Sequence, residues 1–435
     1  MKDQLRALLA AALRDLDVSA ATARHIRRRD HDLYLGHECL DLRSLRRVTV
    51  LAIGKAARPM MRAVLPALAG LPLRGLCVPP AADDDGSPLP PFEVIGGGHP
   101  VPDAGSLRAG ARALELLADG DPRDLVLFLI SGGGSALCEL PLHAHVTLRD
   151  LQILHERLVG SGADILAMNA VRKRVSALKG GRLAVRAAPA RQHTVLVSDV
   201  PRARPDAIAS GPTLPDRGLG DEVALALAAN DLGASLPPVL RAHLTAAAIS
   251  PLPAADSPAF ARSTWHCVLD QDEATAALAN RAREAGMVVT IADTDDRDTA
   301  RQLGDRLLDE LTTLATANPG RTVAVVAGGE LSVPLPPRPG IGGRNQQFVL
   351  HMAQRIAGSR IAVLSAGTDG RDGSAPAAGA VADGTTIARA VAFGFDAATS
   401  ERRCAAHPFF AALDDLVVTD AGNNVRDLRL LVRPA

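Results

Sequence analysis

The sequence is poor in lysine, and its few lysines stand beside motifs that could carry out chemistry. Only four of the 48 basic residues are lysine, and three of these, Lys55, Lys173 and Lys179, lie next to glycine-rich or polar stretches. A lysine ammonium is a compact, rotatable point charge that the planar arginine fork does not reproduce, which suits contact with a transferring phosphoryl group. Chance survival of these lysines is the alternative.

A glycine-rich loop follows the pattern of a buried strand. Leu125–Ile130 is a run of six apolar residues, too short for a membrane span, and it predicts a strand buried on both faces of a parallel sheet. The loop after it reads Ser131-Gly132-Gly133-Gly134-Ser135. Glycines at the carboxyl end of such a strand let backbone N–H groups approach a phosphate closely. A tight strand-to-helix turn without a ligand is the alternative.

Lys55 and Asp199 are both predicted at the carboxyl end of a strand, where open α/β sheets bind ligands. Val48–Ile53 is an apolar run that leads into Gly54 and Lys55, and Thr194–Ser198 leads into Asp199. A cation at a helix start is unfavourable for the helix, which weakens the view that Lys55 is an ordinary surface lysine. Asp199 could hold a metal ion or a substrate hydroxyl, or it could simply begin a turn.

The second half of the chain offers a guanidinium and further carboxylates. Glu330 follows a predicted strand, and Arg344 stands at the start of a predicted helix, where it is well placed to bind an anion. Asp369 and Asp372 lie in a glycine-rich loop after the strand pattern Ile361–Ser365. Carboxylates in such a loop could bind Mg²⁺ or activate a hydroxyl, although Asp-Gly is also a strong turn signal.

Two further polar features are less specific. Asn169, Lys173 and Ser176 are spaced i, i+4, i+7 on a predicted helix, so they form a polar stripe that could line a cleft or face solvent. His99 follows a second glycine-rich turn and could act as an acid or base. A histidine that only holds the turn is the favoured interpretation.

The elements that must position these residues predict an α/β protein of two domains. A chain of 435 residues is too long for one ordinary core. Strand and helix patterns alternate through residues 1–237, a proline-rich linker covers 238–262, and the alternation resumes over 263–435. In the second half, a βαβαβ rhythm that begins with the strand pattern Trp265–Leu269 predicts a mostly parallel sheet.

Composition excludes several classes of partner. The 48 basic and 48 acidic residues cancel, which argues against nucleic acid and an anionic membrane as partners and favours a small molecule. The five cysteines are odd in number and never form a C-x-x-C pair, so we expect a reducing cytoplasm without a disulfide framework or zinc site. The amino-terminal stretch predicts an amphipathic helix and not a signal peptide. The sequence leaves the oligomeric state open, with a homodimer among the options.

Seven motifs in order give the sequence a family resemblance. It is similar to the class II glycerate kinases, the glycerate 2-kinase family with a MOFRL carboxyl-terminal domain. The motifs are IGKAA at Ile53, GGHPVPD at Gly97, LISGGGSAL at Leu129, NAVRKRVSALKGGRLA at Asn169, SDVP with IASGPT around Asp199, GGRNQQF at Gly342 and SAGTDGRDG at Ser365.

The resemblance implies transfer of the γ-phosphoryl group of ATP to the 2-hydroxyl of D-glycerate, with Mg²⁺, to give 2-phosphoglycerate. It also implies two α/β domains with the active site in the cleft between them. The first would be a Rossmann-like, doubly wound sheet, and the second a MOFRL-type α/β domain with a mixed sheet.

Residue roles follow from the resemblance position by position. It implies catalytic roles for Lys55, Arg344 and Asp369, and metal binding by Asp199 and Asp369. It implies contacts with ATP for Ser131, Gly132, Gly133, Gly134, Ser135, Lys173 and Glu330. It implies contacts with the hydroxy acid for Asn169, Asp199 and Asn345.

Two departures from the family pattern keep other functions open. The usual DVPGDDP reads DVPRARP from Asp199 to Pro205, and the usual VTGPTGTNVNDL reads VTDAGNNVRDL from Val418 to Leu428. A kinase of another small hydroxy acid and a non-catalytic ligand sensor are therefore alternatives. Members of the family have also been labelled hydroxypyruvate reductases, but the chain lacks the G-x-G-x-x-G fingerprint of dinucleotide binding, which argues against hydride transfer.

Overall fold

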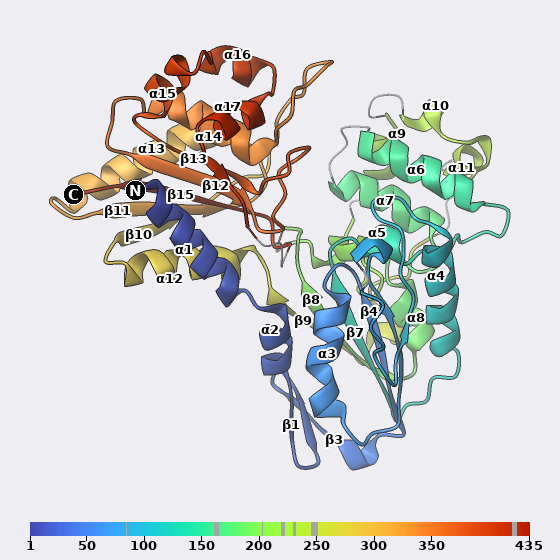
Figure 1. Cartoon of the computed structure of the whole chain (residues 1–435). Helices are drawn as coiled ribbons and strands as arrows, with labels where there is room; N and C mark the ends of the chain where they lie inside the picture. The colour runs from blue at the N-terminus through green and yellow to red at the C-terminus, as the bar shows by residue number, and fades with distance from the viewer. Residues whose placement is uncertain are drawn as a thin grey trace. The chain divides into compact units, whose positions relative to one another are not determined.

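The chain forms two compact units (Figure 1). The structure is a computed structural model, and it describes residues 1–83, 85–160, 165–201, 203–218, 222–228, 232–244, 251–419 and 424–435. The first unit is Val18–Val268, and the second unit combines Met1–Asp17 with Leu269–Ala435. Some positions used in the sequence predictions lie outside the described residues, namely Asp164, Arg202, Asp221, Ala229 and 420–423.

The first unit is built on a six-stranded sheet in the order β6-β5-β4-β7-β8-β9. The pairs β6–β5, β5–β4, β4–β7 and β7–β8 are all parallel. In chain order this is strand order 3-2-1-4-5-6, the doubly wound order of Rossmann-like folds, as predicted. The strands are β4 (Arg47–Ile53), β5 (Leu73–Val78), β6 (Glu93–Val94), β7 (Asp124–Ser131), β8 (Arg191–Val197) and β9 (Ser263–Leu269).

The central strand β7 is buried at all eight positions, as its apolar run predicts. Its neighbours are equally apolar, so the sheet core is continuous from Leu51 through Phe128 to Leu196. Two helices pack against this sheet along different strands: α3 contacts β4, β5 and β7, and α4 contacts β5. The helices of this layer are α3 (Ala57–Leu68), α4 (Ala104–Leu116), α5 (Gly134–Leu137) and α8 (Arg182–Ala187).

Two smaller layers complete the first unit. A helical layer has its own core around Leu154, Val171 and Leu240; it consists of α6 (Leu148–Gly160), α7 (Ile165–Val175), α9 (Glu222–Ala228), α10 (Leu232–Ser235) and α11 (Pro238–His243). A three-stranded antiparallel sheet follows α2 (Val18–His25); it consists of β1 (Ile26–Arg29), β2 (Asp32–Leu35) and β3 (Glu38–Asp41).

The second unit has a mixed six-stranded sheet in the order β10-β11-β15-β12-β13-β14. Only β10 and β11 pair in parallel among its described pairs, and the other four pairs are antiparallel. The strands are β10 (Val288–Ala292), β11 (Val323–Gly328), β12 (Ala362–Gly367), β13 (Gly379–Asp383), β14 (Leu416–Val417) and β15 (Asp427–Arg433).

Helices cover both faces of this sheet. Helices α13 and α14 pack on one face around Leu307, Phe348 and Val325. Figure 1 shows α1 and α12 on the opposite face, and α1 contacts α12, β12 and β13. The helices are α1 (Lys2–Asp15), α12 (Gln271–Glu284), α13 (Ala300–Ala317), α14 (Arg344–Arg355), α15 (Thr386–Ala392), α16 (Ala397–Arg402) and α17 (Ala406–Ala412).

The units differ from the predicted domain limits of 1–237, 238–262 and 263–435. The amino-terminal helix joins the second unit because its apolar face, with Leu5 and Leu9, is buried there. The predicted linker contains α11, whose Leu240 is buried in the first unit. The strand predicted over Trp265–Leu269 belongs to the first sheet, beside β8, and does not open the second.

The mostly parallel second sheet predicted from the βαβαβ rhythm is wrong, and the mixed sheet implied by the family resemblance is confirmed. The last strand, β15, inserts between β11 and β12 and runs antiparallel to both. A rhythm of strands and helices along the chain does not reveal such an insertion, because the inserted strand comes from the far end of the sequence.

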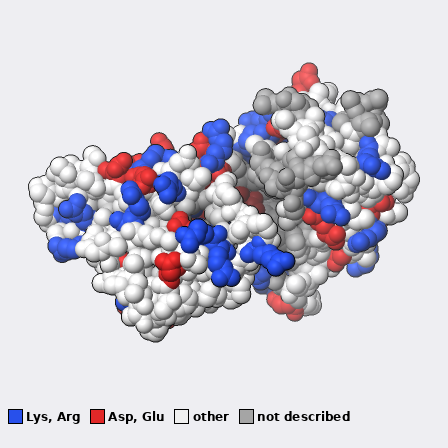
Figure 2. Space-filling view, turned by 90° about the horizontal axis from the view of Figure 1, so that it is seen from above, with Lys and Arg blue, Asp and Glu red and all other residues white. Residues whose placement is uncertain are grey.

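The charges on the surface are mixed (Figure 2), as the equal numbers of basic and acidic residues suggest. Lysine and arginine side chains lie among aspartate and glutamate side chains on the face drawn in Figure 2. Within the residues that the structure describes, no helix combines the length and the apolarity that a bilayer crossing requires.

Candidate active site

In the first unit, the predicted lysine and the glycine-rich loop meet at the switch point of the sheet. Strands β4 and β7 are parallel neighbours, so the residues after them leave the same edge of the sheet. The Lys55 backbone N–H donates to the Gly132 carbonyl at 2.9 Å, and the Ala56 N–H donates to Ser131 Oγ at 2.9 Å. The Lys55 side chain is exposed. A switch point is where doubly wound sheets bind their ligands.

Gly133 fits this edge because it has no side chain. Its φ is +86°, and a Cβ there would lie 3.2 Å from His99 Cδ2 and 3.3 Å from Lys55 Cγ. The loops after β4 and β7 and the turn of His99 therefore converge on one glycine. The sequence favoured a purely structural His99, and the structure places the ring of His99 against Gly133.

Behind the glycine loop, Ser135 begins a chain of buried hydrogen bonds. Ser135 Oγ lies 2.7 Å from Ser210 Oγ, and the Ser210 hydroxyl donates to Asn169 Oδ1 at 3.0 Å. Asn169 Nδ2 donates to the Ala207 carbonyl at 2.9 Å, and Arg172 Nη1 donates to Asn169 Oδ1 at 3.0 Å. Asn169 is thus buried and engaged with the protein, a position that fits support of the loop better than the predicted substrate contact.

The resemblance implies that Lys173 contacts ATP, and the structure places its side chain in the interior of the first unit. Its ammonium is buried and pairs with Asp206 at 3.2 Å and Asp216 at 2.5 Å. Burial opposes ionisation of Asp206, but Arg204 and Lys173 outweigh it and lower the pKa of that carboxyl. Because the ammonium already has two carboxylate partners, a contact with nucleotide phosphate is unsupported by this geometry.

Of two further residues that the sequence singles out in the first unit, Lys179 lies in the interior and Asp199 lies at the carboxyl end of the sheet. Lys179 is buried against Glu139, and burial lowers the pKa of Lys179. Asp199 is half-buried just beyond β8, at the carboxyl end of the sheet as predicted. Of the three motif lysines, Lys55 alone is exposed.

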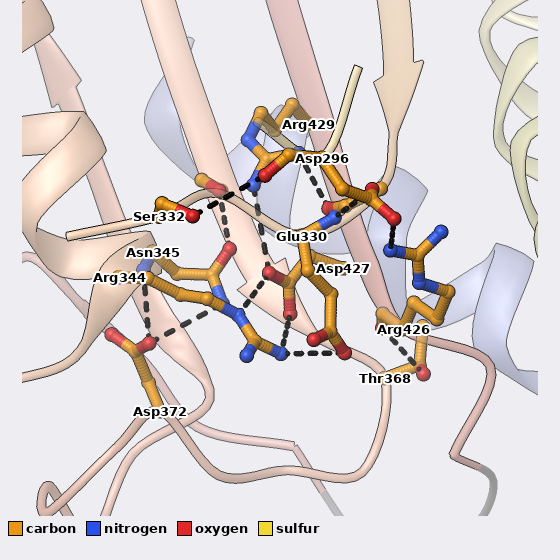
Figure 3. A network of polar contacts seen from close by, with 12 residues as sticks. Asp296, Glu330, Ser332, Arg344, Asn345, Thr368, Asp372, Arg426, Asp427 and Arg429 are labelled. Carbon is orange, nitrogen blue, oxygen red and sulfur yellow. Dashed lines mark hydrogen bonds and ion pairs between the residues drawn. The ribbon is translucent and has the colours of Figure 1, made fainter. Parts of the chain in front are cut away.

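In the second unit, Arg344 lies between two carboxylates (Figure 3). Arg344 Nε donates to Asp427 Oδ2 at 2.6 Å and Nη2 donates to Asp427 Oδ1 at 3.1 Å, which is a bidentate pair. Nη2 also lies 2.9 Å from Glu330 Oε1. Nη1 has no hydrogen bond to any residue that the structure describes. The guanidinium is therefore fixed in place with one nitrogen left for a ligand.

Further charged residues lie around the Arg344–Asp427 pair. We call the whole set the Arg344 network; it consists of Arg344, Asp427, Glu330, Arg426, Arg429 and Asp296. Buried Arg429 donates from Nη1 to the carbonyls of Gly328 at 3.0 Å and Gly329 at 2.9 Å. Arg426 Nη2 lies 2.5 Å from Asp296 Oδ2. Burial opposes ionisation of Asp427, yet Arg344 and Arg429 outweigh it and lower its pKa, so this carboxylate is ionised.

The amino-terminal end of α14 already holds an anion, the carboxylate of Asp372. Asp372 accepts hydrogen bonds from the backbone N–H groups of Asn345 at 2.9 Å and Gln346 at 2.8 Å. Burial raises the pKa of Asp372 to about 6, although these bonds favour the ionised form. Asn345 is buried, and its Oδ1 accepts from the Ser365 hydroxyl at 2.5 Å. Its position likewise fits support better than the predicted substrate contact.

Asp369 lies close to the Arg344 network. A Cβ at Gly367 would be 3.2 Å from Asp369 Oδ1 and 3.5 Å from Asp427 Oδ1, so both carboxylates face this glycine. Asp369 is half-buried, and its Oδ1 accepts the Arg371 N–H at 3.1 Å. It is thus both a turn former and a carboxylate beside the bound guanidinium.

Sequence reasoning missed the residues that hold Arg344. Asp427 and Arg429 lie at the start of β15. This region stands out in the sequence only because its motif differs from the family pattern. The signal that could have found them is the presence of two charged residues, Asp427 and Arg429, at the start of a strand that continues with the apolar run Leu430–Val432. Among the described residues, no group of three or more histidine, cysteine, aspartate or glutamate side chains is arranged to hold a metal ion.

An exposed lysine at a switch point and an arginine fixed by carboxylates are features of an α/β enzyme that acts on a small anionic molecule. Comparison with known proteins makes the class specific. A model described as a domain of unknown function, DUF4147, matches residues 4–245, and the MOFRL family model matches residues 323–427.

Relatives match nearly the whole chain. A D-glycerate 2-kinase of Thermotoga maritima is 34% identical over 90% of this chain and 92% of its own length. A glycerate 2-kinase of Pyrococcus horikoshii is 32% identical over 80% of this chain and 79% of its own length. A protein of Agrobacterium vitis named putative hydroxypyruvate reductase is 35% identical over 89% of this chain and 99% of its own length.

The fold agrees with these relatives. The crystal structure of a glycerate kinase from Thermotoga maritima superposes with a TM-score of 0.80 and 30% identity, covering 99% of both chains. The chain belongs to the class II glycerate kinase family with a MOFRL domain.

Proposed function

We propose that this protein is an ATP-dependent glycerate 2-kinase, which transfers the γ-phosphoryl group of ATP to the 2-hydroxyl of D-glycerate and yields 2-phosphoglycerate. The observation that carries the proposal is the match to the Thermotoga maritima D-glycerate 2-kinase over 90% of the chain, across both units. A kinase of this kind requires ATP and the acid as small-molecule partners.

In the first unit, Lys55 supplies a mobile positive charge beside a loop that exposes backbone. Its ammonium neutralises a phosphate or the substrate carboxylate. The Ser131–Ser135 loop approaches the phosphates through backbone N–H groups, because its glycines present no side chain in the way. The Ser135–Ser210–Asn169 chain keeps this loop in one conformation.

In the second unit, Arg344 stabilises the charge that develops on the migrating phosphoryl group or holds the substrate carboxylate. Its bidentate pair with Asp427 removes most of its rotational freedom before the substrate arrives. Phosphoryl transfer depends mainly on positioning and electrostatic stabilisation, so a guanidinium fixed in advance lowers the barrier without reorganisation.

Asp369 and Asp199 are the carboxylates that we assign to the hydroxyl proton and to Mg²⁺. Both are half-buried carboxylates in loops after strands, and carboxylate oxygens are the donors that Mg²⁺ prefers. Mg²⁺ usually binds one or two carboxylates together with substrate phosphates, so each of these carboxylates by itself is a suitable ligand for the ion. When bound, the ion neutralises phosphate charge, while Asp369 accepts the proton of the 2-hydroxyl.

The first prediction tests these roles with purified protein. The wild type should convert D-glycerate and ATP to 2-phosphoglycerate and ADP, and Lys55→Ala or Arg344→Ala should lower kcat/KM by at least about 100-fold, the scale of losing one charge-stabilising donor. Arg355→Ala is the matched control, because Arg355 ends the same helix in an exposed pair with Asp305 at 2.8 Å. If kcat/KM of both Lys55→Ala and Arg344→Ala equals that of the Arg355→Ala control, the assigned roles are wrong.

Two alternatives have their own readouts. A kinase of another hydroxy acid would show a higher kcat/KM for that acid than for glycerate in a substrate panel. The names of the Agrobacterium vitis relatives favour hydroxypyruvate reduction, and consumption of NADH or NADPH with hydroxypyruvate would support it over the kinase.

A further inference from the structure

A cavity of about 360 Å³ lies in the second unit beside the start of α14. Its wall is aliphatic and comes from one loop, through Leu331, Val333, Leu335 and Pro339. Arg344 and Ser374 stand among its polar lining residues. Cavities of roughly 300–1,000 Å³ with an apolar wall and few polar groups are typical small-molecule sites.

Another part of the cavity lining is glycine backbone. Gly342, Gly343 and Gly373 line the cavity, and a Cβ at Gly343 would lie 2.2 Å from the Asp372 carbonyl carbon. The Ser374 N–H donates to the Gly342 carbonyl at 3.1 Å, and the Gly342 N–H donates to Ser374 Oγ at 3.3 Å. The two glycine segments are thus fixed against each other and contribute backbone without side chains to the lining.

This volume and this aliphatic lining fit a largely apolar group better than a small acid. A three-carbon acid with a carboxylate and two hydroxyls would leave the aliphatic wall uncovered. Leu335 is 69% exposed at this wall, so a ligand that covers it gains apolar burial. A purine ring that packs against these aliphatic side chains would gain that burial.

The charged end of the cavity gives the ligand a direction. The backbone N–H groups at the start of α14 are occupied by Asp372, so they are unavailable to an incoming phosphate. Arg344 lines the cavity, and its Nη1 has no hydrogen bond to a described residue. A phosphate attached to a group in the cavity would therefore meet a guanidinium already fixed by Asp427.

We propose that this cavity binds the nucleoside portion of ATP, with its phosphates directed toward Arg344. This inference rests on the proposed kinase function, and it assigns the base to the second unit.

Photolabelling locates the base directly. Wild-type protein irradiated with 2-azido-ATP and digested with trypsin should carry the label on residues 322–344, because Arg321 and Arg344 are cleavage sites and Pro339 protects Arg338. Excess ADP should suppress the label. Label on residues 124–149, which hold the glycine loop, would place the base in the first unit and overturn the proposal.

Two variants test the wall itself. Leu335→Asp and Val333→Asp should weaken ADP binding at least tenfold by calorimetry, while the binding of inorganic tripolyphosphate changes less than threefold. Val391→Asp is the control, because Val391 is 66% exposed on α15 of the same unit. Leu335 is exposed, so its variant is expected to fold. Unchanged ADP affinity in a folded Leu335→Asp variant, or a loss confined to glycerate, overturns the proposal.

The outcomes separate this inference from the proposed function. If the wild type phosphorylates glycerate and both wall variants bind ADP normally, the cavity assignment is wrong and the proposed function stands. A wild type that binds ADP through this wall without phosphorylating glycerate upholds the cavity and sinks the choice of substrate.

Discussion

At the scale of single residues, the site depends on which charges are free and which are already paired. Lys55 is exposed, whereas Lys173 and Lys179 are buried with carboxylate partners. Arg344 lies between these extremes, because its pair with Asp427 fixes it without using every nitrogen. Arginine suits this position since its fork binds one carboxylate with two donors and keeps another for a ligand.

The carboxylate of Asp372 should make stability depend on pH. Its pKa in the folded protein is raised to about 6 by burial, above the ordinary 3.8. Between these values the folded state binds the proton and the unfolded state does not, so this group favours folding increasingly as pH falls from 7 to 4. Relative to Asp372→Asn, the wild type should gain on the order of 2 kcal/mol of unfolding free energy over that range, measured by urea unfolding.

The control for this prediction is Asp414→Asn, which changes an exposed carboxylate in the same unit. Its unfolding free energy should follow the wild type across the range. Parallel pH curves for wild type and Asp372→Asn would show that the buried carboxyl is not the source of the dependence.

At the scale of elements, the glycine loop is positioned by the convergence of three segments: the loop after β4, the loop after β7 and the turn that holds His99. They meet at Gly133, which has no side chain. The loop after β7 is tied to the start of α3 by the Lys55 and Ala56 N–H bonds. Gly133 then leaves room for both His99 and Lys55. A glycine in this position is a requirement of packing as well as of backbone conformation.

Gly133→Ala separates these two requirements when compared with Gly70→Ala. Both glycines have positive φ, +86° and +78°, but a Cβ at Gly70 would meet no heavy atom within 4 Å. Each substitution should cost roughly 1–2 kcal/mol of unfolding free energy from left-handed strain. Only Gly133→Ala should also lower kinase kcat/KM, by about tenfold or more, because the methyl displaces Lys55. Equal kinase rates in the two variants would mean that this loop does not position Lys55.

At the scale of the whole molecule, the two units are not consecutive halves of the chain. Helix α1 starts the sequence yet packs on the sheet of the second unit, beside α12, and its ends are tied there by ion pairs of Lys2 with Asp415 at 2.7 Å and Asp15 with Arg281 at 2.5 Å. The chain therefore crosses between units after both Asp17 and Val268. The second unit is thus composed of both ends of the sequence.

Leu5→Ala in the full chain should destabilise the second unit alone. Leu5 is fully buried in α1, so the loss should be about 2–5 kcal/mol. Hydrogen exchange should speed up in α12 and β12 while β4 and β7 keep their protection. Leu33→Ala, equally buried in β2 of the first unit, is the reciprocal control. Faster exchange in β4 and β7 of the Leu5 variant would contradict the unit assignment.

The sequence by itself determined what depends on neighbouring residues. The apolar run before Ser131 predicted a buried strand, and hydrophobic spacing predicted the strand-to-helix junction at Lys55. The Rossmann-like order of the sheet was implied by the family resemblance and not by spacing.

Only the tertiary structure decided what depends on residues far apart in the chain. Lys173 pairs with Asp206 and Asp216, and Asp372 accepts a backbone hydrogen bond at the start of α14. Asp427 forms an ion pair with Arg344. Each of these interactions joins segments that no sequence periodicity connects. The same holds for β15 entering the middle of the second sheet and for α1 joining it. Local spacing sets secondary structure, but which charges neutralise one another is set by packing of distant elements.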